Sequence, residues 1–303
     1  MTIAGKIAKH RSIGARAVAL LALILAFAAP QASFAKVEVP PDSRLANIAR
    51  TKTIKLGYRP DARPFSFVNP AQMPTGFTVD LCLLVAKSIE TQLGLDVLRI
   101  EWVSVNSQSR FSAVASGRAD MECGASTATL TRMKQVDFSS YIFVETTGLM
   151  VRSASGLRSL SDMAGKRIAV IGGTTNERAV NDQLKRLKIT ATVVPLKTRD
   201  EAFALFDAGK ADALASDKLL LLGATLKAKD PKSLAILDDQ LSFEPYGIVL
   251  PRGDAGLRLA VNTGLSEIYA SGEIVEIFNR WFAGLGRPSP IMEASYLLGV
   301  IPE

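Results

Sequence analysis

Short apolar strands and helices alternate along much of this 303-residue chain, and the alternation limits its possible folds more than any single motif does. Residues 53–58 predict a strand, residues 80–93 a helix that Gly94 ends, and residues 97–103 a second strand. The same run continues with a helix at 107–116 and strands at 119–123 and 148–152. Strands separated by helices are typical of a largely parallel sheet with helices on its faces.

A second segment repeats this pattern and predicts a second α/β unit. Its predicted strands are 167–171, 192–196 and 212–216, and its predicted helices are 175–187, 199–207 and 217–227. Residues 240–250 are expected to be extended, and residues 256–283 are expected to be helical.

The first 35 residues are typical of an export signal and not of the folded protein. Four basic residues precede an apolar run of thirteen residues at 17–29, and small residues at 33–35 suit cleavage after Ala35. A membrane span needs about 20 apolar residues, so we expect export and cleavage rather than an anchor. The residue directly after the expected cleavage site is Lys36 and not a cysteine, so a lipid tether is not indicated.

Removal of this segment would leave 32 basic and 29 acidic residues, a net charge of +3 instead of +7. No basic block with aromatic residues favours nucleic acid as a partner. The sole histidine, His10, would also be lost. The mature chain then lacks the histidine that Ser-His-Asp and Cys-His mechanisms and the usual zinc sites require, and we expect no cofactor and no metal.

Two cysteines, Cys82 and Cys123, are too few for a disulfide scaffold. They could pair in an oxidising compartment, but Cys82 falls in an apolar helical pattern, where a buried free thiol is an equal alternative. The sequence leaves this choice open.

A hydroxyl-rich segment after the strand at 119–123 offers the groups that grip a carboxylate. Arg132 lies five residues beyond Thr127, and Ser126 precedes it. A guanidinium provides a planar fork of donors for two carboxylate oxygens, and hydroxyl and backbone N–H groups can add further hydrogen bonds. At this spacing the same residues are also compatible with an ordinary turn.

This segment resembles the solute-binding proteins of family 3 that deliver amino acids to bacterial ABC importers, because Arg132 is followed by the run VDFS-x-x-Y from Val136. The resemblance implies a periplasmic, monomeric receptor for a membrane ABC permease. It also implies a type II periplasmic-binding-protein fold, whose two α/β lobes are joined by a two-strand hinge. The expected division is a signal peptide at 1–35, lobe 1 at 36–149 and 245–303, and lobe 2 at 150–244.

The two charged groups of an amino acid need partners in a buried site, and the chain offers candidates for both. Arg132 and Thr127 suit the α-carboxylate, together with the backbone N–H groups of Gly173, Thr174 and Thr175, where a strand ends and a helix begins. Asp217 matches the acceptor of the ammonium group in the family, helped by the carbonyl of Ala125. The alternatives are that Asp217 only caps a helix and that the glycine-rich segment is only a tight turn.

Three further features resemble the glutamate/aspartate-binding members of the family, namely GYRPDARPFSF from Gly57, SQSR from Ser107 and ECG from Glu122. The resemblance assigns the side-chain carboxylate to Arg59, Ser107 and Arg110. Three arginines in one cleft repel each other unless the ligand supplies negative charge, which favours a dicarboxylate.

Two positions depart from the glutamate/aspartate pattern. Ala125 replaces a serine, and Arg199 replaces a histidine near the ligand side chain. Arg199 could contact an acidic side chain or be an exposed residue that begins a helix. Arg63 is expected to face solvent.

Two other functions fit the same architecture. The first is a periplasmic dehydratase of aromatic amino-acid biosynthesis with Glu122 as its general acid, although pairing of Glu122 with a neighbouring arginine is the simpler expectation. The second is an extracytoplasmic sensor, but such sensors usually carry a membrane span and an output domain, and neither is expected here.

Overall fold

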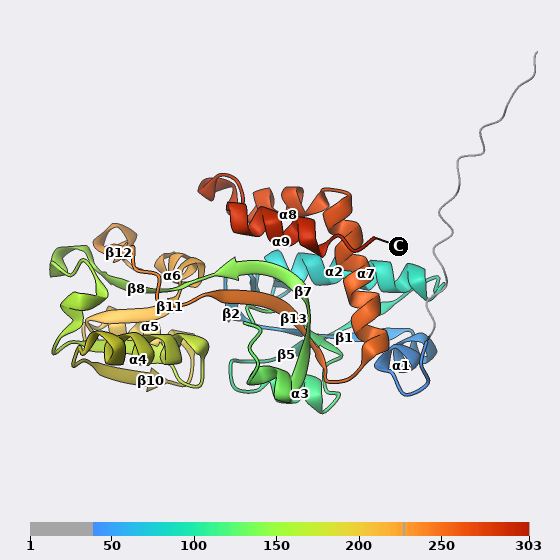
Figure 1. Cartoon of the computed structure of the whole chain (residues 1–303), viewed down its shortest axis with the longest axis horizontal. Helices are drawn as coiled ribbons and strands as arrows, with labels where there is room; N and C mark the ends of the chain where they lie inside the picture. The colour runs from blue at the N-terminus through green and yellow to red at the C-terminus, as the bar shows by residue number, and fades with distance from the viewer. Residues whose placement is uncertain (1–38, 227, 303) are drawn as a thin grey trace, which may run out of the picture. The chain divides into compact units, whose positions relative to one another are not determined.

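The computed structural model describes residues 39–226 and 228–302, which form two five-stranded sheets flanked by helices (Figure 1). This confirms the predicted α/β class with two lobes. The expected export signal at 1–35 lies outside the described residues. Within the two described ranges, no helix combines the length and the apolar character that crossing a membrane requires.

The first sheet has the strand order β5-β1-β6-β13-β7. In that order, the strands span Arg99–Ser104, Thr53–Tyr58, Met121–Glu122, Glu244–Pro251 and Val136–Glu145. The bounds of β1 match the prediction because Lys52, in the left-handed conformation, ends helix α1 (Arg44–Thr51) directly before it.

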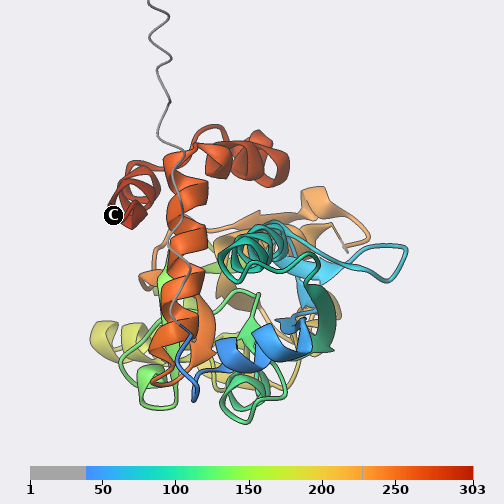
Figure 2. The ribbon, with the colours of Figure 1, turned by 90° about the vertical axis from the view of Figure 1, so that its right-hand side faces the viewer.

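Alternate residues of the first sheet face two different layers. Ile248 and Leu250 of β13 join a large core with α2 (Phe77–Gln92), α7 (Ala255–Ala270) and α8 (Glu273–Phe282). Figure 2 shows α7, in orange, beside these helices. Val249 belongs to a smaller cluster with α3 (Arg110–Ala115). The period-two pattern of the strand therefore places a helix layer on each face.

A disulfide joins Cys82 of α2 to Cys123, which directly follows β6. The open choice between a disulfide and free thiols is thus decided in favour of the disulfide. The bond fixes the start of the segment that carries Ser126, Thr127 and Arg132 to the helix layer of the first sheet.

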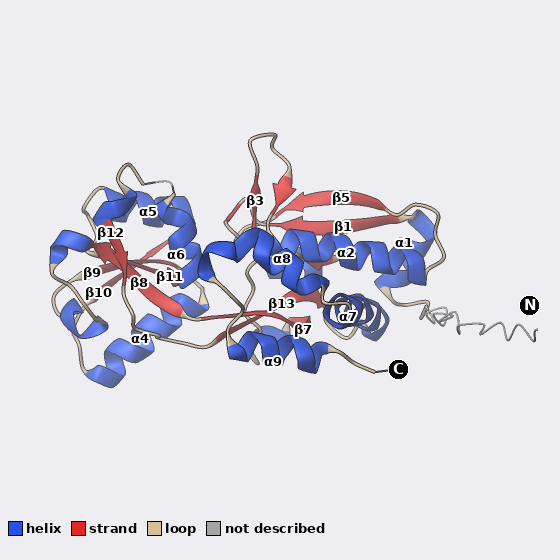
Figure 3. Cartoon of the chain, turned by 90° about the horizontal axis from the view of Figure 1, so that it is seen from above, coloured by secondary structure: helices blue, strands red, loops and turns tan. Residues whose placement is uncertain are grey.

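The second sheet has the strand order β10-β9-β11-β8-β12. In that order, the strands span Thr192–Leu196, Arg167–Ile171, Ala213–Asp217, Thr147–Arg152 and Leu234–Ile236. Helix α4 (Thr175–Leu187) covers one face, and α5 (Arg199–Asp207) with α6 (Lys218–Thr225) covers the other (Figure 3). Leu149 and Val151 of β8 accordingly pack with α4, whereas Met150 packs with α5 and α6.

Both sheets are mixed, so the prediction of largely parallel sheets is wrong. In each, two neighbouring pairs are parallel and two are antiparallel. A parallel pair needs a crossover connection, usually a helix. No helix separates β7 from β8 or β12 from β13, and these connections carry the chain between the two sheets (Figure 1).

The helical tail predicted at 256–283 is two helices, because Ser271 and Gly272 separate α7 from α8 and Gly272 has φ of +79°. Several elements were not predicted. They are α1, the long strand β7, the small sheet β2-β3-β4 (Asp61–Ala62, Ser66–Val68 and Pro74–Thr75), β12 and α9 (Pro290–Gly299).

Candidate ligand-binding site

Arg59 directly follows β1 and is 1% exposed. Its Nη2 donates to Ser107 Oγ over 3.0 Å, so the structure brings these two predicted residues together. Its Nε donates to Asp61 Oδ1 over 3.0 Å, and Nη2 lies 2.8 Å from the same oxygen. Burial raises the pKa of Asp61, but the charges of Arg59 and Arg199 and the hydrogen bonds to its carboxylate together outweigh burial and hold the pKa below its ordinary value. Asp61 was not predicted, although it lies two residues after Arg59.

Arg110 and Arg132 lie against the same aromatic ring. Their guanidinium carbons are 4.6 and 5.0 Å from the centre of the Phe111 ring. Arg132 Nη1 also donates to the carbonyl oxygen of Thr127 over 2.8 Å. Arg110 is buried, and its Nε has no hydrogen-bond partner among the described residues. Burial, followed by repulsion from Arg59 and Arg132, lowers the pKa of Arg110 to about 9.

Glu122 is completely buried, and the charges of Arg110, Arg59 and Arg132 act on it. Its Oε2 accepts a hydrogen bond from Ser126 Oγ over 2.8 Å, and its Oε1 has no hydrogen-bond partner in the described chain. Among the described residues no guanidinium reaches ion-pair distance, so the expected direct pairing with an arginine is wrong. Burial raises the pKa of Glu122, although Arg110 opposes this. The hydroxyl hydrogen of Ser126 is used here and is not free for a ligand.

The net positive charge of the candidate site is smaller than we predicted from its arginines alone. Asp61 neutralises Arg59, and Glu122 lies close enough to favour the charged form of Arg110. Burial raises the pKa of Glu122 and so disfavours its negative charge. Glu122 therefore offsets the positive charge of the remaining arginines less well. In the part of the chain that the structure describes, Arg110, Arg132 and Arg199 therefore have no carboxylate at ion-pair distance.

Arg199 is the first residue of α5 and is neither fully exposed nor paired with a carboxylate. Its Nη1 donates to Ser216 Oγ over 2.6 Å, and its Nε has no hydrogen-bond partner in the described chain. Burial lowers its pKa, whereas Asp61 favours the charged form. Arg199 of the second lobe thus adds to the charge near Arg59 and Asp61. Arg63, in contrast, is exposed and stacks on Phe67 at 3.7 Å.

Thr127 and Thr175 meet with their Oγ1 atoms 3.4 Å apart. Thr127 Oγ1 also donates to Glu244 Oε2 over 2.6 Å, so its hydrogen is already used and the atom can only accept from a ligand. Glu244 is 1% exposed and begins β13. Sequence reasoning missed Glu244, because its contact with Thr127 spans 117 residues.

The other predicted residues of the glycine-rich turn use their polar groups internally. Gly173 N–H donates to Glu177 Oε2 over 2.7 Å. Thr174 Oγ1 accepts from Glu177 N–H and donates to the carbonyl oxygen of Ile171. Thr175 alone of the three reaches a predicted residue of the first lobe. Ala125 is buried in the core of the first lobe.

Asp217 is buried, and its side chain makes no capping bond to helix α6, so the structure does not support the helix-cap alternative. Its Oδ1 accepts from Asn176 Nδ2 over 3.1 Å, and Asn176 also donates to Thr147 Oγ1 over 2.8 Å. Burial, followed by repulsion from Glu244, raises the pKa of Asp217 to about 6. Asp217, Asn176, Thr147 and Glu244 thus form a buried acidic network beside Thr127.

We expect Glu145, the last residue of β7, to make the protein less stable as the pH rises from about 4.5 to about 8. Burial, followed by repulsion from Asp217, raises its pKa from 4.5 to about 8. Over this range the folded protein keeps a proton that the unfolded chain loses. The free energy of unfolding should therefore fall by up to about 1.4 kcal/mol per pH unit. Asp217 adds to the fall between its ordinary pKa of 3.8 and about 6.

Urea unfolding of the wild type and of Glu145→Gln at pH 5, 6, 7 and 8 measures this effect. The variant should show a flatter dependence of the unfolding free energy on pH above pH 6. Equal slopes for the two proteins would show that Glu145 does not titrate in this range.

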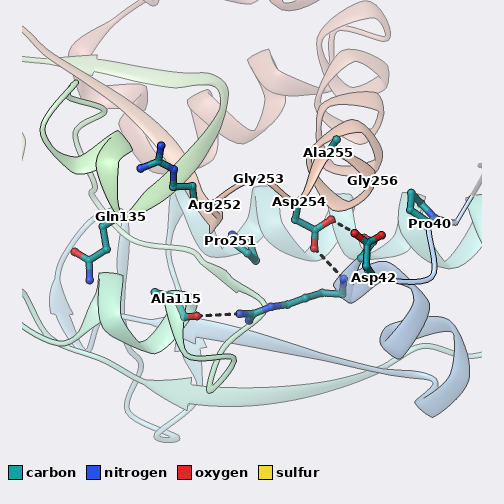
Figure 4. A pocket seen from close by; sticks show the side chains of 12 residues that line it. Pro40, Asp42, Ala115, Gln135, Pro251, Arg252, Gly253, Asp254, Ala255 and Gly256 are labelled. Atoms are coloured by element: carbon teal, nitrogen blue, oxygen red, sulfur yellow. Dashed lines mark hydrogen bonds between the residues drawn. The ribbon is translucent and has the colours of Figure 1, made fainter.

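A separate cavity of about 430 Å³ lies between α1 and the start of α7 (Figure 4). Asp254 Oδ1 accepts from Ser43 Oγ over 2.5 Å, and its Oδ2 accepts from the Arg44 N–H over 2.8 Å. Arg44 also donates to the carbonyl oxygens of Val114 and Ala119. None of the predicted ligand-binding residues lines this cavity, and its charged groups hold α1 in place.

Comparison with known proteins gives consistent results. The model of the bacterial extracellular solute-binding proteins, family 3, matches residues 54–284. An L-glutamate/L-aspartate-binding protein of Pseudomonas aeruginosa is 34% identical, with coverage of 78% of this chain and 79% of the relative. A glutamate/aspartate import solute-binding protein of Escherichia coli is 29% identical over 88% of this chain and 87% of its own length. The structure of an ancestral arginine-binding protein bound to glutamine is also similar, with a TM-score of 0.68, 28% identity and coverage of 76% of this chain and 98% of that one.

Proposed function

Because the chain belongs to the bacterial extracellular solute-binding proteins, family 3, we propose that it captures an acidic L-amino acid, glutamate or aspartate, and delivers it to an ABC permease. The proposed location is the periplasm, and the protein performs no chemistry on its ligand. The main support is the convergence of Arg59, Arg110 and Arg132 with Arg199 of the other lobe. A dicarboxylate would supply the negative charge that this cluster lacks.

We assign the charged groups of the ligand as follows. Arg110, with Arg59 and Ser107, receives the side-chain carboxylate, and Arg132 receives the α-carboxylate. The ammonium group lies by Asp217, and the lone pairs of Thr127 Oγ1 can accept from it because its hydrogen points to Glu244. The ligand thus meets cations at one end and an acidic network at the other.

The dehydratase alternative gains no support from Glu122. A general acid must reach its substrate. Glu122 is completely buried, and Ser126 occupies one of its oxygens. Incubation with prephenate or arogenate and analysis for product would test this alternative.

The proposed lobes close around the ligand by motion at the two connections between the sheets. Sheet membership supports lobe boundaries between 145 and 147 and between 236 and 244, slightly before the expected 149 and 245: β7 and β13 pair in the first sheet, and β8 and β12 pair in the second. Besides the approach of Thr127 to Thr175, two further contacts join the lobes on the ligand side. Gln108 Nε2 donates to the carbonyl oxygen of Lys197 over 2.8 Å, and Gly223 of α6 lies against the backbone of Arg63.

Gly223→Ala should weaken ligand binding without touching the ligand. A Cβ at this position would overlap the carbonyl oxygen of Arg63 and lie 3.1 Å from its carbonyl carbon. If the ligand-bound form keeps the lobe arrangement of this structure, strain of about 1–3 kcal/mol would weaken affinity about 5-fold to 150-fold. The free protein should not lose stability, because alanine favours a helix more than glycine does.

Calorimetric titration and urea unfolding of the same variant measure both quantities. Leu222→Ala is the matched control, since Leu222 is an exposed residue of the same helix. Wild-type affinity in Gly223→Ala would show that α6 does not approach Arg63 in the ligand-bound form.

A thermal-shift screen against the common amino acids and dicarboxylates tests the proposed ligand class. A ligand at 100 times its dissociation constant adds about 2.7 kcal/mol to the stability of the folded state. Glutamate and aspartate should give the largest shifts. A larger shift with arginine or with a neutral amino acid would contradict the proposal.

A further inference from the structure

A cavity of about 460 Å³ lies where the two connections between the sheets meet the C-terminal helices. Its lining includes the end of β7, the segment before β13, the start of α6, and α8 and α9. None of the residues predicted to contact the amino acid takes part. Its volume is within the range of about 300–1,000 Å³ that is common for small-molecule sites.

The walls and the rim of this cavity are largely apolar. Phe143, Phe278 and Met292 are buried wall residues. Phe243, Leu285 and Ile291 are 60%, 49% and 50% exposed and also line it. Single exposed apolar side chains are common, but three that line one cavity indicate a site for an apolar group.

The charged groups of the cavity favour an anion. Arg287 is exposed, and no carboxylate or hydrogen-bond acceptor contacts its guanidinium among the described residues. Glu145 is the acidic residue of the lining. Its Oε2 accepts from Thr146 N–H and its Oε1 from Leu219 N–H. Burial, followed by repulsion from Asp217, raises the pKa of Glu145 to about 8 and so disfavours its negative charge.

We infer that this cavity binds a monocarboxylate with an apolar body, in which the chain or ring fills the space between Phe143, Phe278 and Met292 and the carboxylate meets Arg287. This site is separate from the proposed amino-acid site. Its ligand is an aliphatic or arylalkyl acid without an ammonium group, because both carboxyl oxygens of Glu145, the acidic residue of the lining, already accept from backbone N–H groups.

Occupancy of the cavity should also change the affinity for the amino acid, and this part of the inference rests on the proposed function. Leu219 belongs to the second lobe, whereas Phe278 and Met292 belong to the first. Relative motion of the lobes therefore changes the distance between opposite walls. A cavity ligand that prefers one arrangement of the lobes changes the affinity for the amino acid by some factor. By linkage, the amino acid changes the affinity for the cavity ligand by the same factor.

Calorimetric titration with octanoate, with octan-1-ol as the uncharged control, tests the site in the absence of any amino acid. We expect one octanoate per chain, weaker binding of octan-1-ol, and about 5-fold to 10-fold weaker octanoate binding in Arg287→Ala. Arg258→Ala removes an exposed arginine of α7 that does not line the cavity and should leave octanoate binding unchanged. No octanoate binding at millimolar concentration, or equal binding by wild type and Arg287→Ala, would overturn the inference.

A second titration separates this inference from the proposed function. Saturating octanoate should change the glutamate affinity of the wild type by a factor on the order of the usual coupling between sites. This factor should be at least 3-fold larger than the corresponding factor in Arg287→Ala. If octanoate binds but glutamate does not, the proposed ligand is wrong and the cavity site stands. One-for-one displacement of octanoate by glutamate, in both the wild type and Arg132→Ala, would show that octanoate occupies the amino-acid site. In that case the inference fails.

Discussion

Arg132→Ala should weaken binding of the amino acid by about 2–5 kcal/mol, because the buried α-carboxylate would lose its charged partner. Among the described residues, no carboxylate lies within ion-pair distance of Arg132. It donates to the carbonyl oxygen of Thr127, and its charge is favoured mainly by Glu244 and Asp217. Calorimetric titration with glutamate, aspartate and glutamine measures the loss. All three ligands should be affected, because all share the α-carboxylate.

Two controls accompany this measurement. Arg258→Ala removes an equally positive but exposed residue and should bind as the wild type does. Urea unfolding should show little change for Arg132→Ala. If the variant keeps wild-type affinity for every ligand tested, Arg132 is not part of the site.

Arg110→Ala should weaken glutamate and aspartate binding by about 2–5 kcal/mol and glutamine binding by much less. In our assignment Arg110 contacts the side-chain carboxylate, which glutamine lacks. Arg110 gives a clearer test than Arg59, because removal of Arg59 would leave Asp61 without its partner. Calorimetry with the three ligands gives the selectivity directly.

The same variant should be as stable as the wild type, or more stable, when no ligand is bound. The charged form of Arg110 is disfavoured by burial and by repulsion from Arg59 and Arg132. Alanine removes this unfavourable charge, so affinity and stability should change in opposite directions. Equal losses for glutamate and glutamine, together with a lower free energy of unfolding, would indicate a structural role instead.

Local signals in the sequence predicted most of the repeating units. The bounds of β9, α4, β10 and α5 agree with their predictions, because side-chain caps at Thr174 and Thr198 begin the two helices. Strand β7 was quoted within a family motif but was not predicted as a strand. The mixed sheets were missed because the direction of a strand depends on pairing partners far away in the chain.

In the candidate site, too, residues with local sequence signals could be predicted, and residues brought in by distant contacts could not. Arg132 was proposed from its spacing to Thr127, whereas Arg59 and Arg110 came from the resemblance to a family and could not have been chosen from spacing alone. Asp61 was within reach of local reasoning, whereas Glu244 and Asn176 come close to Thr127 and Asp217 only after the chain folds. Buried acidic residues that offset the charge of buried arginines are therefore the part of such a site that is hardest to predict from the sequence.

Competitive calorimetric titration of the purified protein with L-glutamate, L-glutamine and L-arginine tests the central claim most directly. We predict one glutamate per chain, with an affinity at least about tenfold higher than for glutamine, a difference of about 1.4 kcal/mol or more, and no measurable binding of arginine. Tighter binding of glutamine or arginine than of glutamate would contradict a site built for a dicarboxylate.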